Sequence, residues 1–549
     1  MRKTLFFVAI FAVSAICLNA QTPQANQPVA RPKLVVGLVM DQMRWDYLYR
    51  YYDMYSETGG FKKLLKEGFT CENAFLPYTP SITACGHASA YTGSVPAING
   101  IAGNSWWDKE QNRTVYCTED KSVNTVGSSS QQGKMSPRNM LVSTIADELR
   151  FSNNYRGKTI GIAIKDRGAI LPAGHSANAA YWYDNSVGNW ISSTYYMEQL
   201  PNWVNNVNAK KMPDQYYEKG WSLLYPAEKY VQSTTDDKAY ETKTLGGNTF
   251  PYDLKKYVGK DYGKINTTPF GNSMTIEFAK EAVVNEALGA DNIPDFLTVS
   301  FSSPDYIGHS YGPNSMEAED AMLRLDAELG QFIQFLEKQV GKGQFTLFLT
   351  ADHGAAPIPE FLQENKMPAG RVYIGKLTDR LNKAVKDKFG INKGILSDDN
   401  YQLTLNKFSI DSAGIKFNVV VDFLVKQLQF EPGIDRAFAA SELNTISLPA
   451  PIRTKLINGY YPNRCGDIQV ILKPNFIEGY SNTGTTHGLW NPYDTHIPLL
   501  WYGWGVKKGS LNREVYMTDI AATLAAMLHI QMPSGCIGNV ITELTTQSK

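Results

Sequence analysis

The sequence predicts an α/β protein with a mostly parallel sheet and helices on both faces. Continuous apolar runs, which are typical of buried parallel strands, alternate along the chain with longer amphipathic segments. Such alternation of strand and helix is the pattern of this fold class. Polar residues follow most of the runs, and ligands of open α/β sheets bind beyond the carboxyl ends of the strands. The runs lie at 33–40, 159–164, 295–300 and 345–350, with a further strand-like run at 497–502.

The first twenty residues have the pattern of a secretory signal peptide. Two basic residues precede an apolar stretch at 5–18 that is too short to span a bilayer, and Ala20 ends a suitable cleavage site. Cys17 raises the alternative of a lipoprotein signal, but Ile16 is larger than the residue that such a signal carries before its cysteine. We therefore expect residues 1–20 to be removed and the protein to be periplasmic or secreted, without a membrane anchor.

Helices are predicted between the strands from the spacing of their apolar residues. The longest spans 314–340, where Asn314 and Glu317 resemble a capping box. Gly59 and Gly60 are expected to interrupt the first helical segment. The other segments lie at 45–67, 136–149, 276–288 and 518–528.

Two stretches depart from the alternation and are predicted as insertions into one catalytic domain over 21–549. Residues 175–270 are rich in Tyr, Trp, Asn and Pro and show little period, which predicts an irregular segment that covers a face of the sheet. Residues 360–480 contain strand and helix patterns without catalytic spacing, which indicates a small α+β insertion. Its elements are expected at 402–405, 417–428 and 468–472.

The composition gives no overall charge that would indicate nucleic acid or an anionic membrane as partner. Lys plus Arg equals Asp plus Glu, at 53 each. The 549 residues are 43% hydrophobic and can bury a large core. The six cysteines contain no C-x-x-C pair, which argues against a cysteine zinc site. A disulfide between Cys71 and Cys117 remains open at this stage.

Polar side chains that can bind metals follow separate apolar runs. If the runs are parallel strands of one sheet, these side chains meet at one edge. Each alone has an ordinary explanation, since a carboxylate after a strand commonly caps a helix. Pro304, Gly308 and Gly312 indicate a loop for the segment after the third run. The clusters are Asp41, then Asp305 with His309, then Asp352 with His353, then His487.

These three carboxylates and three histidines fit two metal ions. Zinc binds histidine nitrogen and carboxylate oxygen, and a catalytic zinc keeps three protein ligands with one position open. The same donors also accept manganese or iron, so the residues leave the metal undecided. An accessory calcium or magnesium is not decided either.

A candidate nucleophile lies in the stretch 77–104. Thr83 is expected at the first positions of a short helix that ends before Gly93. Its hydroxyl would lie among free backbone N–H groups at the positive end of the helix dipole, a place that favours an anion. As an isolated feature Thr83 is better explained as a helix cap. The metal-binding residues elsewhere in the chain make a nucleophile the better interpretation.

Several motifs together resemble the alkaline phosphatase superfamily, and most closely its PafA-type bacterial alkaline phosphatases. They include D-Q-M-R-W-D, P-S-I-T-A-x-G-H, K-D-R, D-Y-I-G-H, A-D-H-G-A and G-T-T-H. The resemblance covers nearly the whole chain after the signal peptide. It implies a phosphomonoesterase with two zinc ions on a mostly parallel sheet, exported to the periplasm.

The resemblance also implies a role for each motif residue. Thr83 would be the nucleophile, phosphorylated during turnover and in contact with the metals. Two zinc ions roughly 4 Å apart would assist an in-line displacement. One zinc would be held by Asp305, His309 and His487, the other by Asp41, Asp352 and His353, and the phosphoryl oxygens would be bound by Asn104, Lys165 and Arg167.

Lys165 and Arg167 favour a phosphomonoesterase over its relatives. They are two residues apart, so an extended backbone directs both to the same side, where two cations suit the charge of a monoester. A nucleotide pyrophosphatase/phosphodiesterase of the same superfamily is the alternative, and a non-catalytic surface binding protein with this fold is another. The C/S-x-P-x-R pattern of sulfatases is absent around Cys85. His87 is expected to be a packing residue and not a base.

The expected partners are therefore small phosphate monoesters. No nucleic acid is expected as a dedicated partner, and the chain is expected to be a monomer. The preferred monoester is not determined, because the insertions set access to the site.

Overall fold

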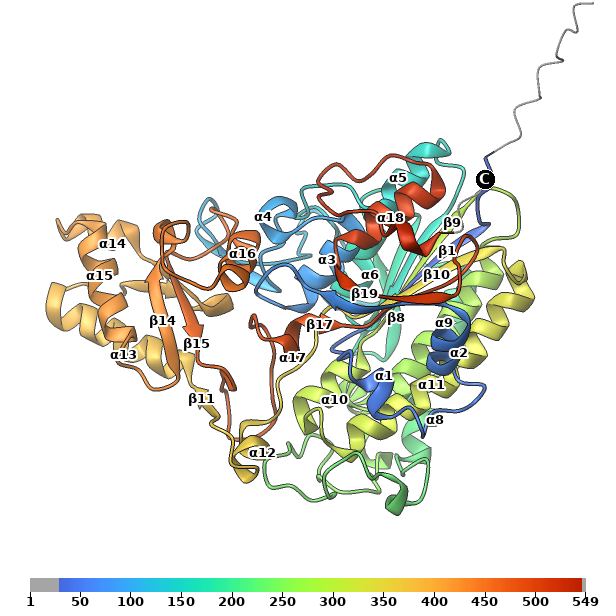
Figure 1. The fold of residues 1–549 in the computed structure, drawn as a ribbon, viewed down its shortest axis with the longest axis horizontal. Helices are drawn as coiled ribbons and strands as arrows, with labels where there is room; N and C mark the ends of the chain where they lie inside the picture. The colour runs from blue at the N-terminus through green and yellow to red at the C-terminus, as the bar shows by residue number, and fades with distance from the viewer. Residues whose placement is uncertain (1–28, 546–549) are drawn as a thin grey trace, which may run out of the picture. The chain divides into compact units, whose positions relative to one another are not determined.

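A computed structural model describes residues 29–545 and confirms the predicted α/β class. The predicted signal peptide at 1–20, with Cys17, lies outside the described residues. The central sheet has 11 strands (Figure 1). They are β1 Leu34–Met40, β2 Phe69–Phe75, β5 Thr125–Val126, β6 Thr159–Ala163, β7 Ala179–Asp184, β8 Asn189–Ser193, β9 Asp295–Phe301, β10 Phe345–Thr350, β17 His496–Ile497, β18 Leu499–Gly503 and β19 Gly509–Tyr516. Their order is β17-β2-β18-β10-β1-β9-β6-β7-β8-β5, with β19 beside β2.

The centre of the sheet is parallel and its strands end in register. Strands β10, β1, β9, β6 and β7 run parallel, and antiparallel pairs flank them on both sides. Met40 lies opposite Phe301, and Ala163 lies opposite Ser300. Every residue of β1, β9 and β10 is buried, as expected for continuous apolar runs. The residues that follow these strands are therefore brought to one edge.

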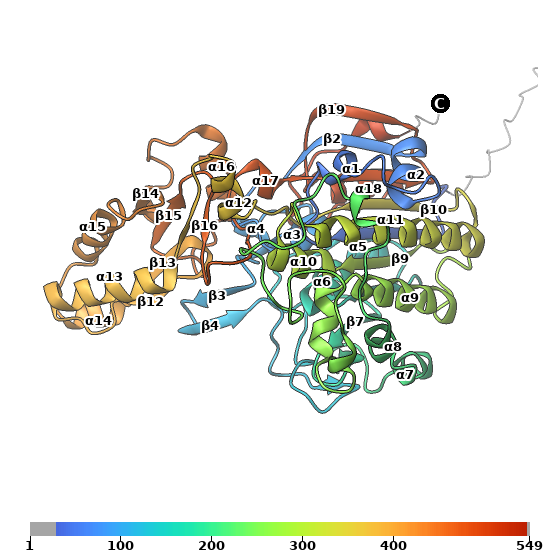
Figure 2. The same cartoon turned by 90° about the horizontal axis from the view of Figure 1, so that it is seen from below.

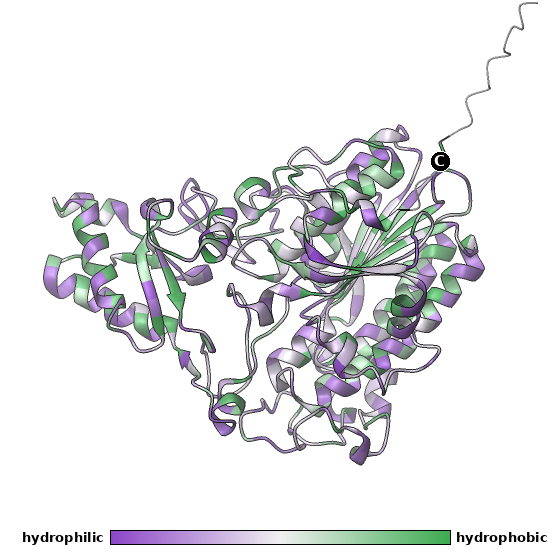
Figure 3. Ribbon diagram, viewed as in Figure 1, coloured by the Kyte–Doolittle hydropathy of each residue, from purple (hydrophilic) through white to green (hydrophobic). Residues whose placement is uncertain are grey.

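Helices cover both faces of the sheet (Figure 1). Figure 3 shows that the helices carry hydrophobic and hydrophilic residues together, as packing on a sheet requires. One layer contains α2 Gly60–Glu67, α9 Phe270–Asn285 and α11 Met316–Leu336, and the other contains α3 Thr83–Thr92, α5 Ile145–Ser152, α6 Asp166–Ala173 and α18 Asp519–Leu528. The short helix α1, Tyr47–Arg50, ends well before α2, which begins directly after Gly59. The predicted interruption near Gly59 is therefore confirmed.

Two helix starts were predicted wrongly. Residues 136–144 are not helical, and α5 begins after Thr144, which forms a capping box with Asp147. Helix α11 is capped by Ser315, whose hydroxyl accepts from the backbone N–H of Ala318 at 3.1 Å, and not by Asn314 with Glu317. In both cases the helix begins where a side-chain oxygen reaches a free amide of the first turn.

The segment 175–270 is not irregular throughout. Its first part forms β7 and β8, which extend the central sheet beyond β6. The strand β7 is fully buried, but its aromatic residues do not form the aliphatic run from which the other strands were predicted. The remainder contains α7 Asn202–Ala209, α8 Met212–Lys219 and three short 3-10 turns in an otherwise irregular course.

The segment 360–480 has a sheet of its own (Figure 2). Strand order is β12-β13-β15-β14, and these strands with α13 and α15 enclose a separate apolar cluster. The described residues from Pro32 onward, with both insertions, form one compact unit. The elements are α12 Pro359–Glu364, β11 Gly370–Val372, α13 Ile374–Phe389, β12 Ile395–Ser397, β13 Gln402–Leu405, α14 Lys407–Ser412, α15 Phe417–Leu428, β14 Ile434–Ala439, α16 Ala450–Gly459, β15 Ile468–Leu472 and β16 Phe476–Glu478.

The cysteines of the described residues are all free thiols. Cys71 and Cys117 are both buried and unpaired, so the disulfide left open by the sequence is not formed in this structure. Among residues 29–545, no helix has the length and apolar character needed to cross a bilayer.

Candidate metal and phosphate site

The predicted metal-binding side chains converge at the edge where the parallel strands end. Asp41 follows β1, while Asp352 and His353 follow β10. Asp305 and His309 belong to α10, Ser303–Tyr311, directly after β9. A loop was predicted there, but proline is well suited to the first turn of a helix and Gly312 ends it. The spacing of four residues thus places Asp305 and His309 on one helix face.

The first group contains Asp41, Asp352 and His353, all with fully buried side chains. Nε2 of His353 lies 3.5 Å from Oδ1 of Asp41 and 3.4 Å from Oδ2 of Asp352. These two carboxylate oxygens are buried without a hydrogen-bond partner among the described residues. Unpartnered buried anionic oxygens that face a histidine nitrogen fit a metal ion.

The second group contains Asp305, His487 and again His353. Oδ1 of Asp305 lies 3.5 Å from Nε2 of His487 and 3.2 Å from Nε2 of His309. The His309 side chain is 36% exposed and that of His487 only 7%, so the group opens to solvent at His309. Because the rings of His353 and His487 stack with centroids 3.5 Å apart, the two groups are adjacent.

The three histidines are oriented for metal binding by the main chain. Nδ1 of His309 bonds to the Thr485 carbonyl at 2.8 Å, and that of His487 to the Ser81 carbonyl at 2.7 Å. Nδ1 of His353 bonds to the Gly354 carbonyl at 2.9 Å. A carbonyl accepts only from N–H, so Nδ1 of each ring carries a proton and Nε2 faces the carboxylates.

Burial and neighbouring charges shift the pKa values of the site in different directions. Burial lowers the pKa of His353 to about 3, which keeps its ring neutral. Burial alone would raise the pKa of Asp305, but the charges of His309 and Lys165 hold it well below the ordinary value. Asp41 differs, because burial and the neighbouring Asp352 raise its pKa.

Lys165 lies between the two groups. Its ammonium bonds to Oδ2 of Asp41 at 2.7 Å and to Oδ2 of Asp305 at 2.5 Å. The side chain is buried and also lies 5.1 Å from the ring centroid of Tyr306. A cation held between these carboxylates shows that this place attracts positive charge, as two metal ions would require.

Thr83 lies beside the shared histidine. It is the first residue of α3 and fully buried, and Gly93 ends the helix in a left-handed conformation, as predicted. Its hydroxyl is 3.3 Å from Nε2 of His353. The oxygen therefore combines a helix N-terminus with proximity to both metal groups.

Asn104 is held by neighbouring backbone and Arg167 by a tyrosine. Oδ1 of Asn104 accepts from the N–H of Ala84 at 3.0 Å, which leaves the amide N–H groups free to donate to a ligand. The Arg167 guanidinium donates to the hydroxyl of Tyr116 at 3.0 Å. That hydroxyl donates in turn to Asp166 at 2.8 Å.

Sequence reasoning missed Gln42. Its side-chain amide donates to Asp305 at 2.7 Å, and its backbone N–H donates to Asp352 at 3.1 Å, so it joins the two groups. Its backbone is left-handed, with φ 66°, and its side chain passes close to Gly308, where a Cβ atom would clash. Its position directly after Asp41 was the one feature of the sequence that could have indicated a role in the site.

His87 is fully buried. Nδ1 lies 2.8 Å from the Thr83 carbonyl and 3.3 Å from Asp352, and Nε2 lies 2.7 Å from the Ser300 hydroxyl. It packs behind the nucleophile and one carboxylate, in agreement with the role expected for it.

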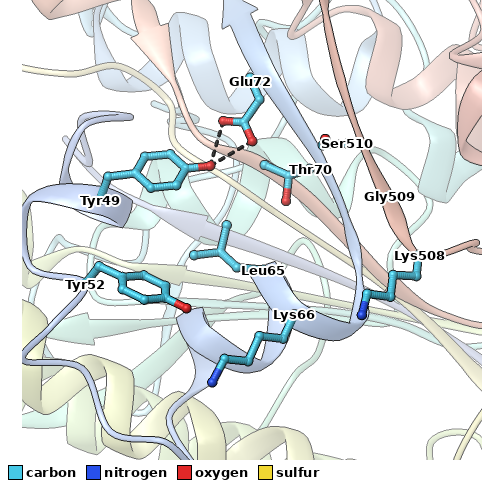
Figure 4. Close-up of a pocket in the computed structure, with 9 residues that line it drawn as sticks. All are labelled: Tyr49, Tyr52, Leu65, Lys66, Thr70, Glu72, Lys508, Gly509 and Ser510. Carbon is cyan, nitrogen blue, oxygen red and sulfur yellow. Dashed lines mark hydrogen bonds between the residues drawn. The ribbon is translucent and has the colours of Figure 1, made fainter.

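A pocket of about 440 Å³ between α2, β2 and β19 is separate from this site (Figure 4). Tyr49 and Tyr52 point into it, and the Tyr49 hydroxyl bonds to Glu72 at 2.7 Å. It is lined by neither histidine nor any of the predicted site residues. The chemistry therefore belongs to the edge of the sheet and not to this hollow.

Known proteins share both the sequence and the fold. The family described as Type I phosphodiesterase / nucleotide pyrophosphatase matches residues 35–493. Alkaline phosphatase PhoV of Synechococcus elongatus is 50% identical over 560 residues, covering 99% of this chain and 100% of PhoV. Alkaline phosphatase PafA of Elizabethkingia meningoseptica is 45% identical over 544 residues, covering 98% of each chain.

A crystal structure of wild-type PafA superposes with a TM-score of 0.93 at 45% identity, covering 95% of this chain and 100% of that one. The match to PhoV covers 99% of the chain and that to PafA 98%, which confirms the family resemblance seen in the motifs. The chain therefore belongs to the alkaline phosphatase superfamily, among the PafA-type alkaline phosphatases, which are phosphomonoester hydrolases.

Proposed function

We propose that this alkaline phosphatase is exported and hydrolyses small phosphate monoesters through a phosphothreonine at Thr83. The position of the Thr83 hydroxyl carries the proposal, since it lies 3.3 Å from the histidine that both metal groups share. The proposed metals are two zinc ions. Asp305, His309 and His487 would hold one, and Asp41, Asp352 and His353 would hold the other.

Zinc ions bound there would supply Lewis acidity, lowering the pKa of the attacking hydroxyl or water and stabilising the leaving oxygen. The Thr83 oxygen forms a bond to phosphorus while the bond from phosphorus to the alcohol oxygen breaks. Water then cleaves the phosphothreonine, which restores the hydroxyl and releases inorganic phosphate.

Three side chains would bind the phosphoryl oxygens during both steps. Asn104 donates from its amide, Lys165 supplies a point charge and Arg167 offers a planar pair of donors. The charge spread over the equatorial oxygens in the transition state strengthens these contacts. Buried surroundings strengthen them further, because Lys165 is almost fully enclosed.

A diesterase activity is the second candidate, because the matching family is described by phosphodiesterase and pyrophosphatase activity. A diester has one more esterified oxygen and one less charge than a monoester. The cationic pair Lys165 and Arg167 favours the monoester, and matched aryl monoester and diester substrates would distinguish the two activities.

The proposal is tested by acid-quenching the enzyme during turnover of an aryl phosphate and analysing its peptides by mass spectrometry. We expect phosphate on the peptide that contains Thr83, and loss of turnover on chelation that zinc restores. Full turnover by metal-free protein, or phosphate on a different residue, would exclude the mechanism. Periplasmic or culture-medium recovery of protein beginning near Gln21 would test export.

A further inference from the structure

The insertion at 360–480 reaches the catalytic site through two residues with an uncommon backbone. Asn400 and Tyr401, in the 3-10 turn Asp399–Tyr401 before β13, both have φ 60°. A single left-handed asparagine is common in turns, but an aromatic residue seldom adopts this conformation. Strain of this kind persists where surrounding contacts impose it. The hydrogen bonds of the two side chains indicate why this backbone conformation is kept.

Asn400 holds the segment that carries the phosphate-binding residues. Its amide donates to the Ser105 carbonyl at 2.9 Å, immediately after Asn104. The approach depends on Gly103, where a Cβ atom would lie 2.4 Å from the Asn400 amide nitrogen. Ser105 begins β3, Ser105–Asp108, and pairs with Tyr116 at the end of β4, Arg113–Tyr116.

This hairpin links two of the proposed phosphate contacts. Asn104 precedes β3, and Tyr116 accepts the hydrogen bond from Arg167. The bond from Asn400 to Ser105 therefore fixes the end of the hairpin from which both Asn104 and Arg167 are positioned.

Tyr401 holds the metal-binding loop. Its hydroxyl donates to the His487 carbonyl at 3.1 Å, while the ring of the same histidine bonds to Ser81. The Tyr401 side chain passes over Gly488, whose φ of 122° and lack of a Cβ atom leave room for the aromatic ring. Tyr401 is only 7% exposed, so this contact is packed on all sides.

The sheet of the insertion also holds the 3-10 turn that contains Asn400 and Tyr401 in place. Gln469, on β15, donates to the Tyr401 carbonyl at 3.1 Å, and Gln402 donates to Gln469 at 3.1 Å. Both glutamines are buried. The strained turn is thus joined to the apolar core of the insertion and cannot relax independently of it.

We propose that Asn400 and Tyr401 are positioning residues through which the insertion aligns the phosphate-binding and metal-binding sides of the site. Asn400 positions Asn104 and Arg167 through its bond to Ser105, and Tyr401 positions His487 through its bond to the His487 carbonyl. The proposal rests on the function proposed above, because it assigns these partners to phosphate and metal. It predicts different effects for the two residues, which a general loss of stability would not produce.

The test compares Asn400→Gly with Tyr401→Phe in the zinc-loaded full-length mature protein. Glycine tolerates the left-handed backbone and removes the side chain with its amide, while phenylalanine keeps the ring and removes only the hydroxyl. Two measurements are made: kcat/KM for an aryl phosphate at saturating zinc, and the rate of zinc release to a chelator. Controls are Asn382→Ala, which loses a 2.9 Å bond to Ile395 in the same insertion, and Tyr217→Phe, which loses a 2.8 Å bond to Asp261.

Asn400→Gly is expected to lower kcat/KM roughly three- to tenfold with unchanged zinc release, and Tyr401→Phe to accelerate zinc release by a similar factor. The controls should change neither quantity. If both variants behave like the controls, or both change the two quantities together in proportion to a lower Tm, the proposal is overturned. If the wild type itself does not turn over aryl phosphate, the proposed function fails, whereas zinc release still reports on Tyr401.

Discussion

The edge of the sheet and the contact between the 175–270 insertion and α11 both bury carboxylates, with opposite consequences. At the edge, Asp305 and Asp352 have pKa values held below the ordinary value. Near the insertion, burial raises the pKa of Glu241 to about 9 and that of Glu317 to about 7. Burial acts in the same direction in both places, so it does not explain the difference.

The neighbours explain it. Asp305 lies beside His309 and the Lys165 ammonium, which stabilise its ionised form. Asp352 lies beside the rings of His353 and His87 and also feels the charge of Lys165, so its ionised form is stabilised too. Glu241 instead faces Glu317 and the surrounding acids, and its Oε2 atom is buried without a hydrogen-bond partner. Apart from Asp41, whose pKa is raised, the carboxylates at the edge keep their charge in a dry environment, whereas Glu241 and Glu317 lose theirs more easily. Substitutions at the edge of the sheet should therefore change the rate of catalysis, and those at Glu241 and Glu317 should change the stability of the fold.

The largest effect is expected for Thr83→Ala. Removal of the proposed nucleophile should lower kcat for an aryl phosphate by at least about 1000-fold with little change in Tm. Thr83→Ser should retain part of the activity. Thr92→Ala is the matched control, because Thr92 lies on the same helix and its hydroxyl donates to the Ala88 carbonyl at 2.8 Å and accepts from the Ser94 N–H at 3.2 Å. Full activity of Thr83→Ala would contradict the mechanism and the distinction between the two regions.

A difference between the two metal groups should appear next. His353 belongs to both groups, whereas His309 lies near one carboxylate of the site, Asp305, and is partly exposed. His353→Ala should reduce bound zinc in both groups, and His309→Ala should leave one ion bound per chain. Metal analysis after dialysis, with activity measured in parallel, checks this. Equal zinc content in the two variants would show that the groups bind metal as one unit.

Lys165→Ala and Arg167→Ala are expected to have a smaller effect that depends on the substrate. A charge-assisted contact is worth about 1.5–3 kcal/mol, which corresponds to a roughly ten- to hundredfold loss of kcat/KM on a monoester. The loss on a matched diester should be smaller, because the diester carries less charge. The two changes need not add, since both residues would bind the same phosphoryl group. Equal losses on both substrates would mean that these cations do not recognise the charge of the monoester.

The smallest effect, and one confined to stability, is expected for Glu241→Gln. Because its folded pKa is raised to about 9 from the ordinary value of 4.5, the folded state prefers the protonated acid. Its stabilising contribution is complete below about pH 4.5 and is lost as pH rises through about 9. Glutamine should therefore raise Tm at alkaline pH more than at acidic pH, with kcat/KM unchanged. Thermal unfolding across this range is the measurement, with the exposed Glu228→Gln as control. A pH-independent change in Tm would show that Glu241 does not titrate as described.

The sequence alone determined the sheet core and which side chains are candidates for metal binding. Continuous apolar runs form strands only where both faces are covered, so the runs ending before Asp41 and Asp352 were unambiguous. The predicted and observed bounds of β10 agree at 345–350. The motif residues could be named because each follows such a strand or carries a distinctive pattern.

Only the tertiary structure decided how these parts meet. The sequence did not show that Asp305 and His309 lie on a helix, because Pro304 and the nearby glycines indicate a loop when their helix-terminal positions are unknown. Nor could it show that β7 joins the sheet, or that Gln42, Asn400 and Tyr401 contact the site. These contacts join residues separated by up to hundreds of positions, and local pattern carries no information about such pairs. The choice of partner, which also sets the pKa of each buried acid, is made by the folded arrangement.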